Sequence, residues 1–186
     1  SYTNATKNNI SESDVYSIFV HKATSNSYFL DNTLVTGRDA IRIKVNSNNN
    51  TFINNSVSDH TDYGLYSTDS DSNSYTNNTF DNNSINVLLS ASLTNTFTNN
   101  SIFGSAVGMQ VKSSSTSLTL INNTINSTSL PSLEINDSNS VTLSDNRLYN
   151  DVRFDNTNSV TFNKNNTIQT NLNITNSDII TLSDNN

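Results

Sequence analysis

Four side chains between positions 21 and 66 could together act on an acidic sugar. They are His21, Arg42, Lys44 and Tyr66. A cation held against a uronate carboxylate makes the neighbouring C–H more acidic, and a Tyr, His or Lys side chain could then carry the proton. Basic residues on an exposed strand also keep that strand soluble and discourage unwanted pairing. The four residues are therefore candidates for catalysis, with a plain solvated surface as the alternative.

A second candidate site is acidic. The stretch DSDSN at 69–73 has the D-x-D-x-N opening of a calcium-binding loop, which makes Asp69 and Asp71 candidate calcium ligands. The pattern fails further on, because its sixth position is Ser74 instead of Gly and its twelfth is Phe80 instead of Glu. With no Cys, two His and one Met, the sequence offers no transition-metal site. We expect no resident metal or other cofactor, and interpret the aspartates as an acidic, solvated corner.

Asn, Ser and Thr dominate the composition. The chain has 37 Asn, 31 Ser and 24 Thr among 186 residues, and only 32% of its residues are hydrophobic. Such polarity favours disorder, but the apolar residues recur at regular positions and indicate a thin, periodic core. The net charge is -7 with nine Lys plus Arg, too few for the basic stripe that nucleic-acid binding needs. No run of eighteen apolar residues exists, so we expect no membrane span.

One phrase repeats along the whole chain. It reads NTFINNSV at 50–57 and NTFTNNSI at 95–102. The Asn two places before the final apolar residue serves as an anchor, and the anchors are Asn32, Asn55, Asn78, Asn100, Asn123, Asn146 and Asn166. A trace of the phrase comes earlier at Asn8, and Asn185 would be the last anchor. From Asn8 to Asn185 the spacings are 24, 23, 23, 22, 23, 23, 20 and 19 residues, a period typical of a solenoid.

Apolar residues keep three places in each repeat. Three residues before the anchor stand Phe29, Phe52, Tyr75, Phe97, Leu120, Leu143 and Leu182, with Phe162 one place off. Two residues after it stand Ile10, Leu34, Val57, Phe80, Ile102, Ile125, Leu148 and Ile168. About ten residues later comes an i, i+2 pair: Ile18/Val20, Ile41/Ile43, Leu65/Ser67, Val87/Leu89, Met109/Val111, Leu133/Ile135, Val152/Phe154 and Leu172/Ile174. Alternation of period two indicates short strands.

Three short strands per repeat, separated by polar corners, describe one coil of a parallel β-helix. We predict an all-β, single-domain solenoid over residues 1–186, with about eight coils of 19–24 residues. Coils that stack at about 4.8 Å give a rod of roughly 40 Å. The anchor Asn would sit at a tight corner, where it tolerates unusual backbone angles. Its amide would join the next coil in a ladder of hydrogen bonds.

The repeat resembles that of a known family. The phrase N-x-T-F/I-x-N-N-T/S-I, followed by a Gly-containing strand as at 63–66, is similar to the right-handed parallel β-helix repeat. The resemblance covers nearly the whole chain and implies a right-handed coil. That family includes pectate-lyase-like enzymes, alginate-modifying epimerases and lyases, and many archaeal and bacterial surface proteins. The resemblance is therefore specific for fold and not for function.

In enzymes of this family the polymer lies along a strand face, and the four candidate residues would share the outer face of the third strand. Alginate epimerases carry a D-P-H signature, but the nearest stretch here, SDH at 58–60, lacks the Pro and the spacing. A glycoside hydrolase needs paired carboxylates. On this face Glu134 stands alone between Gln110 and Arg153, which disfavours hydrolysis.

A column of threonines raises an ice-binding alternative. Thr96, Thr119, Thr142, Thr161 and Thr181 share one outward position. Ice-binding faces usually need two parallel ranks, and the neighbouring rank is mixed: Thr98, Ile121, Ser144, Asn163 and Ser183. Threonine is also simply a good outward strand residue.

Twelve N-x-S/T sequons favour an extracellular or cell-surface location. The potential glycosylation sites are Asn4, Asn9, Asn126, Asn136 and Asn173. Several other sequons fall in the anchor phrase, where we expect folding to hinder modification. The first residue is Ser instead of Met, which is typical of a mature or excised chain.

The repeat runs to both ends of the sequence without a cap. Solenoids need caps, because a terminal coil exposes apolar side chains and unpaired strand edges. We therefore expect either a segment of a longer solenoid or head-to-tail stacking of copies into a filament.

The first expectation for function is an extracellular structural or adhesive β-solenoid of a microbial cell surface, self-assembling end to end. This interpretation leans away from an enzyme. The alternatives are a uronate lyase or epimerase that uses the four candidate residues, and a non-catalytic carbohydrate-binding module.

Overall fold

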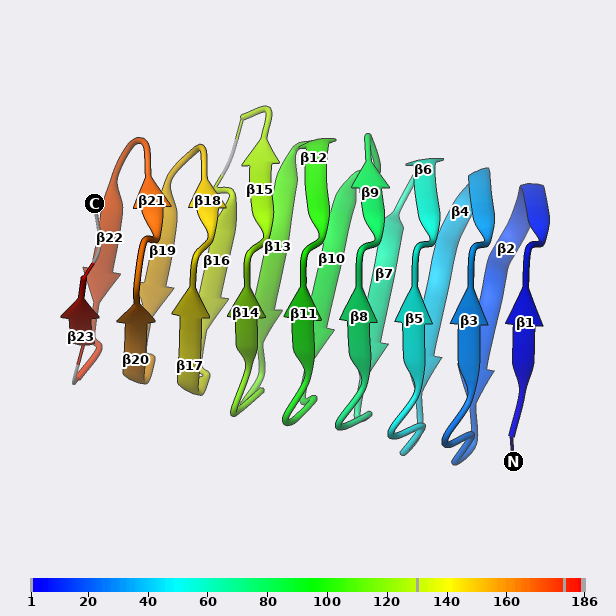
Figure 1. Ribbon diagram of the computed structural model, residues 1–186, viewed down its shortest axis with the longest axis horizontal. Helices are drawn as coiled ribbons and strands as arrows, with labels where there is room; N and C mark the ends of the chain where they lie inside the picture. Colours follow the sequence, from blue (N-terminus) through cyan, green and yellow to red (C-terminus); the bar gives the residue numbers. More distant parts are fainter. Residues whose placement is uncertain (1, 130, 179, 185–186) are drawn as a thin grey trace.

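The protein is a parallel β-helix of about eight coils, built from strands and corners (Figure 1). The computed structural model describes residues 2–129, 131–178 and 180–184. Asn185, the last anchor of the sequence, lies outside these residues. No helix of the described chain has the length and apolarity needed to cross a membrane. The predicted all-β solenoid is confirmed.

The first strand of each coil belongs to one nine-stranded parallel sheet, here called the first column. Figure 1 shows its arrows side by side and pointing the same way. Its strands are β1 (Asn4–Thr6), β3 (Tyr28–Leu30), β5 (Thr51–Ile53), β8 (Ser74–Thr76), β11 (Thr96–Thr98), β14 (Thr119–Ile121), β17 (Asn139–Ser144), β20 (Asn158–Asn163) and β23 (Ile180–Ser183).

The other strands form two further columns that merge in the first coils. There β2 (Asn9–His21) and β4 (Thr33–Lys44) run without a break through both columns, so all these strands count as one sheet. The second column continues as β6 (Ser56–His60), β9 (Thr79–Asp81), β12 (Ser101–Ser105), β15 (Thr124–Ser127), β18 (Arg147–Leu148) and β21 (Thr167–Ile168). The third continues as β7 (Tyr63–Thr68), β10 (Ile85–Ser90), β13 (Val107–Lys112), β16 (Leu133–Asn136), β19 (Val152–Asp155) and β22 (Leu172–Thr175).

The predicted apolar positions fill the interior through most of the rod, in register from coil to coil. Phe29 pairs with Phe52, Leu34 with Val57, and Ile41 with Leu65. Phe162, one place off in the sequence, pairs with Leu143 and so keeps the register. Burying each such side chain contributes about 1.5–3 kcal/mol. The shared interior fixes which residue of each strand points inward. In the last coils the prediction was wrong for Ile174 and Leu182, which are 41% and 61% exposed because no further coil of the described chain covers them.

Aromatic rings stack through the first column. The ring centroids of Phe29 and Phe52 are 4.6 Å apart, those of Phe52 and Tyr75 are 5.2 Å apart, and those of Tyr75 and Phe97 are 4.4 Å apart. Tyr75 is fully buried, and this burial raises the pKa of its phenol, an effect that Ser67 partly offsets. Ser67 stands where other repeats have an apolar residue in the third column. The hydroxyl groups of Tyr75 and Ser67 therefore lie near each other in the interior.

The anchor asparagines form a buried ladder at the corner between the first and second columns. They are at most 2% exposed. From Asn32 to Asn166, each Nδ2 donates to the Oδ1 of the next anchor at 2.9–3.1 Å. The backbone N–H of each anchor donates to the same oxygen, as Asn78 does to Asn100 at 2.9 Å. Nδ2 also donates to a carbonyl of the previous coil, as Asn100 does to Tyr75 at 3.0 Å.

The unusual backbone angle lies one residue before the anchor. Positive φ values occur at Asp31, Asn54, Asn77, Asn99, Asn122, Asp145 and Asn165, and not at the anchors. The prediction that the anchor itself takes the strained conformation was wrong. Its buried amide is needed for hydrogen bonds, whereas the exposed residue before it turns the chain, and Asn and Asp tolerate that turn.

Two further buried ladders were not predicted. Asn50 donates from Nδ2 to Oδ1 of Asn73 at 3.1 Å, and the N–H of Asn73 donates to Oδ1 of Asn95 at 3.0 Å. At another corner the N–H of Ser47 donates to Oγ of Ser70 at 3.2 Å, and this pattern continues through Ser92 and Ser115. All three ladders satisfy backbone donors that the corners would otherwise bury without a partner.

Replacing Asn100 by Ala should destabilise the protein by about 3 kcal/mol, because it leaves buried partners on both neighbouring coils unsatisfied. The measurement is the free energy of unfolding in urea, followed by circular dichroism. Asn163→Ala is the control, because Asn163 is exposed at the end of β20 and its loss should cost less than about 0.5 kcal/mol. Equal losses in the two variants would contradict a structural role for the ladder.

Candidate functional site

The four candidate residues lie together on the outer face of the third column. Phe19 pairs with Arg42 and His21 with Lys44 between β2 and β4, and Arg42 pairs with Tyr66 of β7. The alternation of the strands turns all of them outward, away from the apolar interior. The first three coils therefore present one continuous cluster of rings and cations, here called the aromatic–cation face.

Stacked rings form one half of this face. The ring centroids of Tyr16 and Phe19 are 4.8 Å apart, and those of Phe19 and His21 are 4.9 Å apart with planes at 15°. Phe19 is 45% exposed, which is unusual for a ring of its size and leaves it open to a ligand. Nζ of Lys44 lies 5.2 Å from the centroid of Phe19. Burial, and then the positive charges of Lys44 and Lys22, lower the pKa of His21.

Arg42 is the fixed cation of the other half. Its guanidinium lies 3.7 Å from the centroid of Tyr66, and Nη1 donates to Oδ2 of Asp39 at 3.0 Å. Asp39 is only 1% exposed. Burial raises the pKa of Asp39, and the positive charges of Arg42 and Arg38 oppose that rise. Held by an ion pair below and a ring beside it, Arg42 presents a pre-oriented guanidinium, which suits recognition of a carboxylate.

Sequence reasoning missed three members of this face. Tyr16 and Asp39 pair across β2 and β4, and the ring centroids of Tyr63 and Tyr66 are 5.0 Å apart. Each of these three residues comes two places before the apolar i, i+2 pair of its repeat. At that point the chain turns between the second and third columns, and the repeat pattern does not predict which side chains face outward. The aromatic residues Tyr16, Phe19, Tyr63 and Tyr66 were the signal in the sequence that could have indicated a larger aromatic surface.

Further along the third column the outer face is different. Leu88 is 1% exposed, although strand alternation places it in register between the outward residues Tyr66 and Gln110. Beyond it, Nε2 of Gln110 donates to Glu134 at 2.7 Å. The aromatic–cation face is thus confined to the first three coils.

The candidate calcium ligands have structural partners. Oδ1 of Asp71 accepts the backbone N–H of Leu93 at 2.7 Å, and Oδ2 of Asp69 accepts the hydroxyl of Thr68 at 3.3 Å. Across the described residues no three His, Cys, Asp or Glu side chains gather into a group that could hold a metal ion. Asp71 therefore joins two neighbouring coils through its hydrogen bond with the N–H of Leu93.

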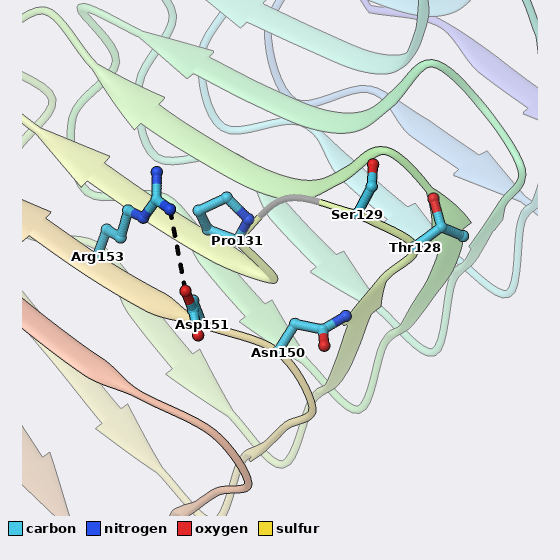
Figure 2. Close-up of a pocket in the computed structure, with 6 residues that line it drawn as sticks. All are labelled: Thr128, Ser129, Pro131, Asn150, Asp151 and Arg153. Carbon is cyan, nitrogen blue, oxygen red and sulfur yellow. Dashed lines mark ion pairs between the residues drawn. The ribbon is translucent and has the colours of Figure 1, made fainter.

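A polar pocket of about 230 Å³ lies on later coils (Figure 2). It is lined by Thr128, Ser129, Pro131, Asn150, Asp151 and Arg153. Nη2 of Arg153 lies 3.9 Å from Oδ2 of Asp151, and Asn171 donates to Oδ1 of Asp151 at 3.0 Å. The pocket therefore carries one cation beside one anion, and it lacks the rings of the aromatic–cation face.

The potential glycosylation sites are on the surface. Asn4, Asn9, Asn126 and Asn173 are exposed, and Asn136 is half-buried. The sequons of the anchor phrase begin at exposed left-handed corners such as Asn54 and Asn99, so their asparagines are more accessible than expected.

A buried histidine lies next to the aromatic–cation face. His60 is 2% exposed; its Nδ1 is 3.1 Å from Oδ1 of Asn83, and its Nε2 is 3.5 Å from Oγ of Ser17. Burial lowers the pKa of His60, although its hydrogen bonds to Asn83 and Ser58 and the negative charges of Asp39 and Asp59 act the other way. The ring is therefore neutral in the folded protein at neutral pH.

The chain belongs to the right-handed β-helix family. The sequence pattern described as the right handed beta helix region matches residues 1–125, more than half of the chain. This match includes the whole aromatic–cation face. A comparison with curated proteins found no match. The family sets the hand of the coil and the solenoid architecture.

His60 should make folding pH-dependent. Because its pKa is lowered in the folded state, the unfolded chain binds the proton first, and stability present above about pH 6.5 is lost as the pH falls. The free energy of unfolding, measured between pH 7 and pH 5, should fall less steeply in His60→Gln than in the wild type. His21→Gln removes the other histidine, which is half-buried and also has a lowered pKa, and it should therefore reduce the slope too, but less than His60→Gln does. A wild-type slope in His60→Gln would refute this assignment.

Proposed function

We propose that the protein is an extracellular, adhesive β-solenoid of a cell surface that binds an acidic polysaccharide. The observation that carries this proposal is the aromatic–cation face, where exposed rings lie beside an oriented arginine. The solenoid serves as a rigid support, since neighbouring coils of the described chain are hydrogen-bonded by strands and, from Asn32 to Asn166, by the anchor ladder. The sequons at exposed corners and the polar surface support a location outside the cell.

The chemistry of the face suits a chain of uronate sugars. The flat faces of pyranose rings pack against aromatic rings, as Phe19 and Tyr16 could offer. Arg42 and Lys44 could pair with carboxylates, and charge-assisted hydrogen bonds of this kind contribute about 1.5–3 kcal/mol each. The coils repeat at about 4.8 Å, close to the length of one sugar in an extended polymer, so neighbouring coils could bind neighbouring sugars.

Binding fits this face better than turnover. Lyase chemistry needs a free base at the reacting carbon, but the Tyr66 ring is engaged by Arg42 at 3.7 Å and Asp39 is buried beneath it. The face also lies on an open strand surface, which excludes little water. A uronate lyase or epimerase that uses His21, Arg42, Lys44 and Tyr66 remains the alternative.

Arg42→Ala should weaken binding to an alginate or pectate oligomer about 10- to 100-fold, as expected from losing one charge-assisted contact. Isothermal titration calorimetry measures this effect. Arg147→Ala removes an exposed arginine from the second column and should leave binding unchanged.

Tyr66→Phe separates the two functions. It keeps the ring, so a binding protein should retain its affinity, whereas an enzyme that needs the phenol should lose formation of unsaturated product. Absence of binding to any uronate polymer by the folded wild type would overturn the proposal.

End-to-end association is a separate proposal. What supports it is that β1 and β23, at the two edges of the first column, each pair with one strand within the described chain. A second copy could continue the sheet there, and a heterologous contact of this kind produces a filament.

Electron microscopy of the native protein should show filaments with an axial repeat of roughly 40 Å. Ile180→Asp places a charge at the last coil and should abolish them, whereas Ser90→Asp in the middle of the rod should not. Discrete short rods of the wild type at every concentration would argue against self-association.

A further inference from the structure

The corner between the first and second columns carries an exposed asparagine on five coils. Each comes directly before a buried anchor, and the five are Asn54, Asn77, Asn99, Asn122 and Asn165. Figure 1 shows four of these bends in one row, between β5 and β6, β8 and β9, β11 and β12, and β14 and β15. All five side chains are exposed, whereas the anchors that follow them are at most 2% exposed. The corner therefore presents one carboxamide to solvent on each of these coils.

Each of the five asparagines begins an N-x-S/T sequon, the acceptor pattern for N-glycosylation. The hydroxyl residue is the first residue of a second-column strand, and the five are Ser56, Thr79, Ser101, Thr124 and Thr167. These residues are half-buried or exposed. The turn itself does not require asparagine, because Lys7, Asp31 and Asp145 adopt the same positive φ at this place. The exposed carboxamide is therefore a chemical feature beyond what the turn needs.

The buried asparagines of the described chain are not part of this pattern, and none of them begins a sequon. An apolar inward residue follows two places after the anchor, as Val57 follows Asn55 and Ile102 follows Asn100. A glycan on a corner asparagine therefore leaves the ladder with all its amides.

The hydrogen bonds of the corner also tolerate a glycan. Nδ2 of Asn54 donates to Oδ1 of Asp31 at 3.1 Å, and Nδ2 of Asn122 donates to Oδ1 of Asn99 at 2.9 Å. An unmodified carboxamide nitrogen bears two hydrogens. It loses only one of them when it is joined to a sugar, so the hydrogen bond to the previous coil can persist.

We propose that this corner is an N-glycosylation site that is repeated along the rod. The inference rests on the extracellular location in the proposed function and not on polysaccharide binding. Nδ2 forms a bond to C1 of a sugar while the bond from C1 to the phosphate of a lipid-linked sugar donor breaks. The phosphate leaves with the lipid, and a base of the transferase takes the amide proton. Because the corner joins the first and second columns, the glycans leave the aromatic–cation face on the third column open.

The experiment is peptide mass spectrometry of the folded protein secreted by cells that attach N-glycans. Enzymatic removal of a glycan converts the linked Asn to Asp and so marks each occupied site. We expect modification at the corner, highest at Asn165, because the coil before it carries Asp145 there and leaves more room. Ser56→Ala removes the sequon but keeps Asn54, and it should abolish modification of Asn54.

Two substitutions at the same corner give a gained site and its matched control. Asp31→Asn completes a sequon with Thr33, so this position should become occupied. Asp145→Asn makes the same chemical change, but Arg147 stands in the third place, so no glycan should appear. Each secreted variant should unfold at the urea concentration of the wild type, which shows that the corner carries the glycan in the folded state.

Glycans confined to other sequons, such as those of Asn4 and Asn173, with the five corner asparagines bare would overturn the inference. A secreted wild type without any N-glycan would overturn it too, as would a corner modified only in unfolded protein. Titration of the glycan-free protein with a uronate oligomer tests the proposed function separately. A bare corner with retained binding contradicts only this inference, and a modified corner without binding contradicts only the polysaccharide proposal.

Discussion

The buried amide of the anchor asparagine is the interaction on which the rest of the structure depends. At this corner the anchor asparagines are buried, so the backbone donors there need partners inside the protein. Each anchor supplies an acceptor to the coil before it and a donor to the coil after it, as Asn78 does between Asn55 and Asn100. The turn itself is made by the preceding exposed residue. Division of these two tasks between adjacent residues explains why the sequence reads Asn-Asn so often at this place.

Once the coils are locked in register, the three columns share one interior but have independent outer faces. The inward positions must fit one another, so they vary little in kind. The outward positions are constrained only by their neighbours within a rank, and each column can carry its own chemistry. The third column carries rings and cations in its first coils, and the first column carries uncharged hydroxyls. A rod of this design could therefore present separate surfaces to separate partners.

Much of the architecture could be predicted because the period is read directly from apolar residues and anchors. The register of Phe162 was recovered even though its repeat is shorter, since the interior leaves one place for its ring. The candidates His21, Arg42, Lys44 and Tyr66 were found together because strand alternation alone places them on one face. Asp39 and Tyr16 were missed, because they lie where β2 and β4 turn through a corner. The Ser47 ladder was missed because serine is common throughout the sequence.

The sequence by itself determined the repeat length and most of the inward residues, because these follow from periodicities along the chain, and the resemblance of its repeat phrase indicated the family. Only the tertiary structure decided which side chains meet across coils. It placed Arg42 against Tyr66 of the next coil and against Asp39 of its own strand, buried Leu88 in register between Tyr66 and Gln110, and moved the left-handed angle from the anchor to the residue before it. The physical reason is that these features depend on corner geometry, on burial and on side chains of neighbouring coils, which no local pattern encodes.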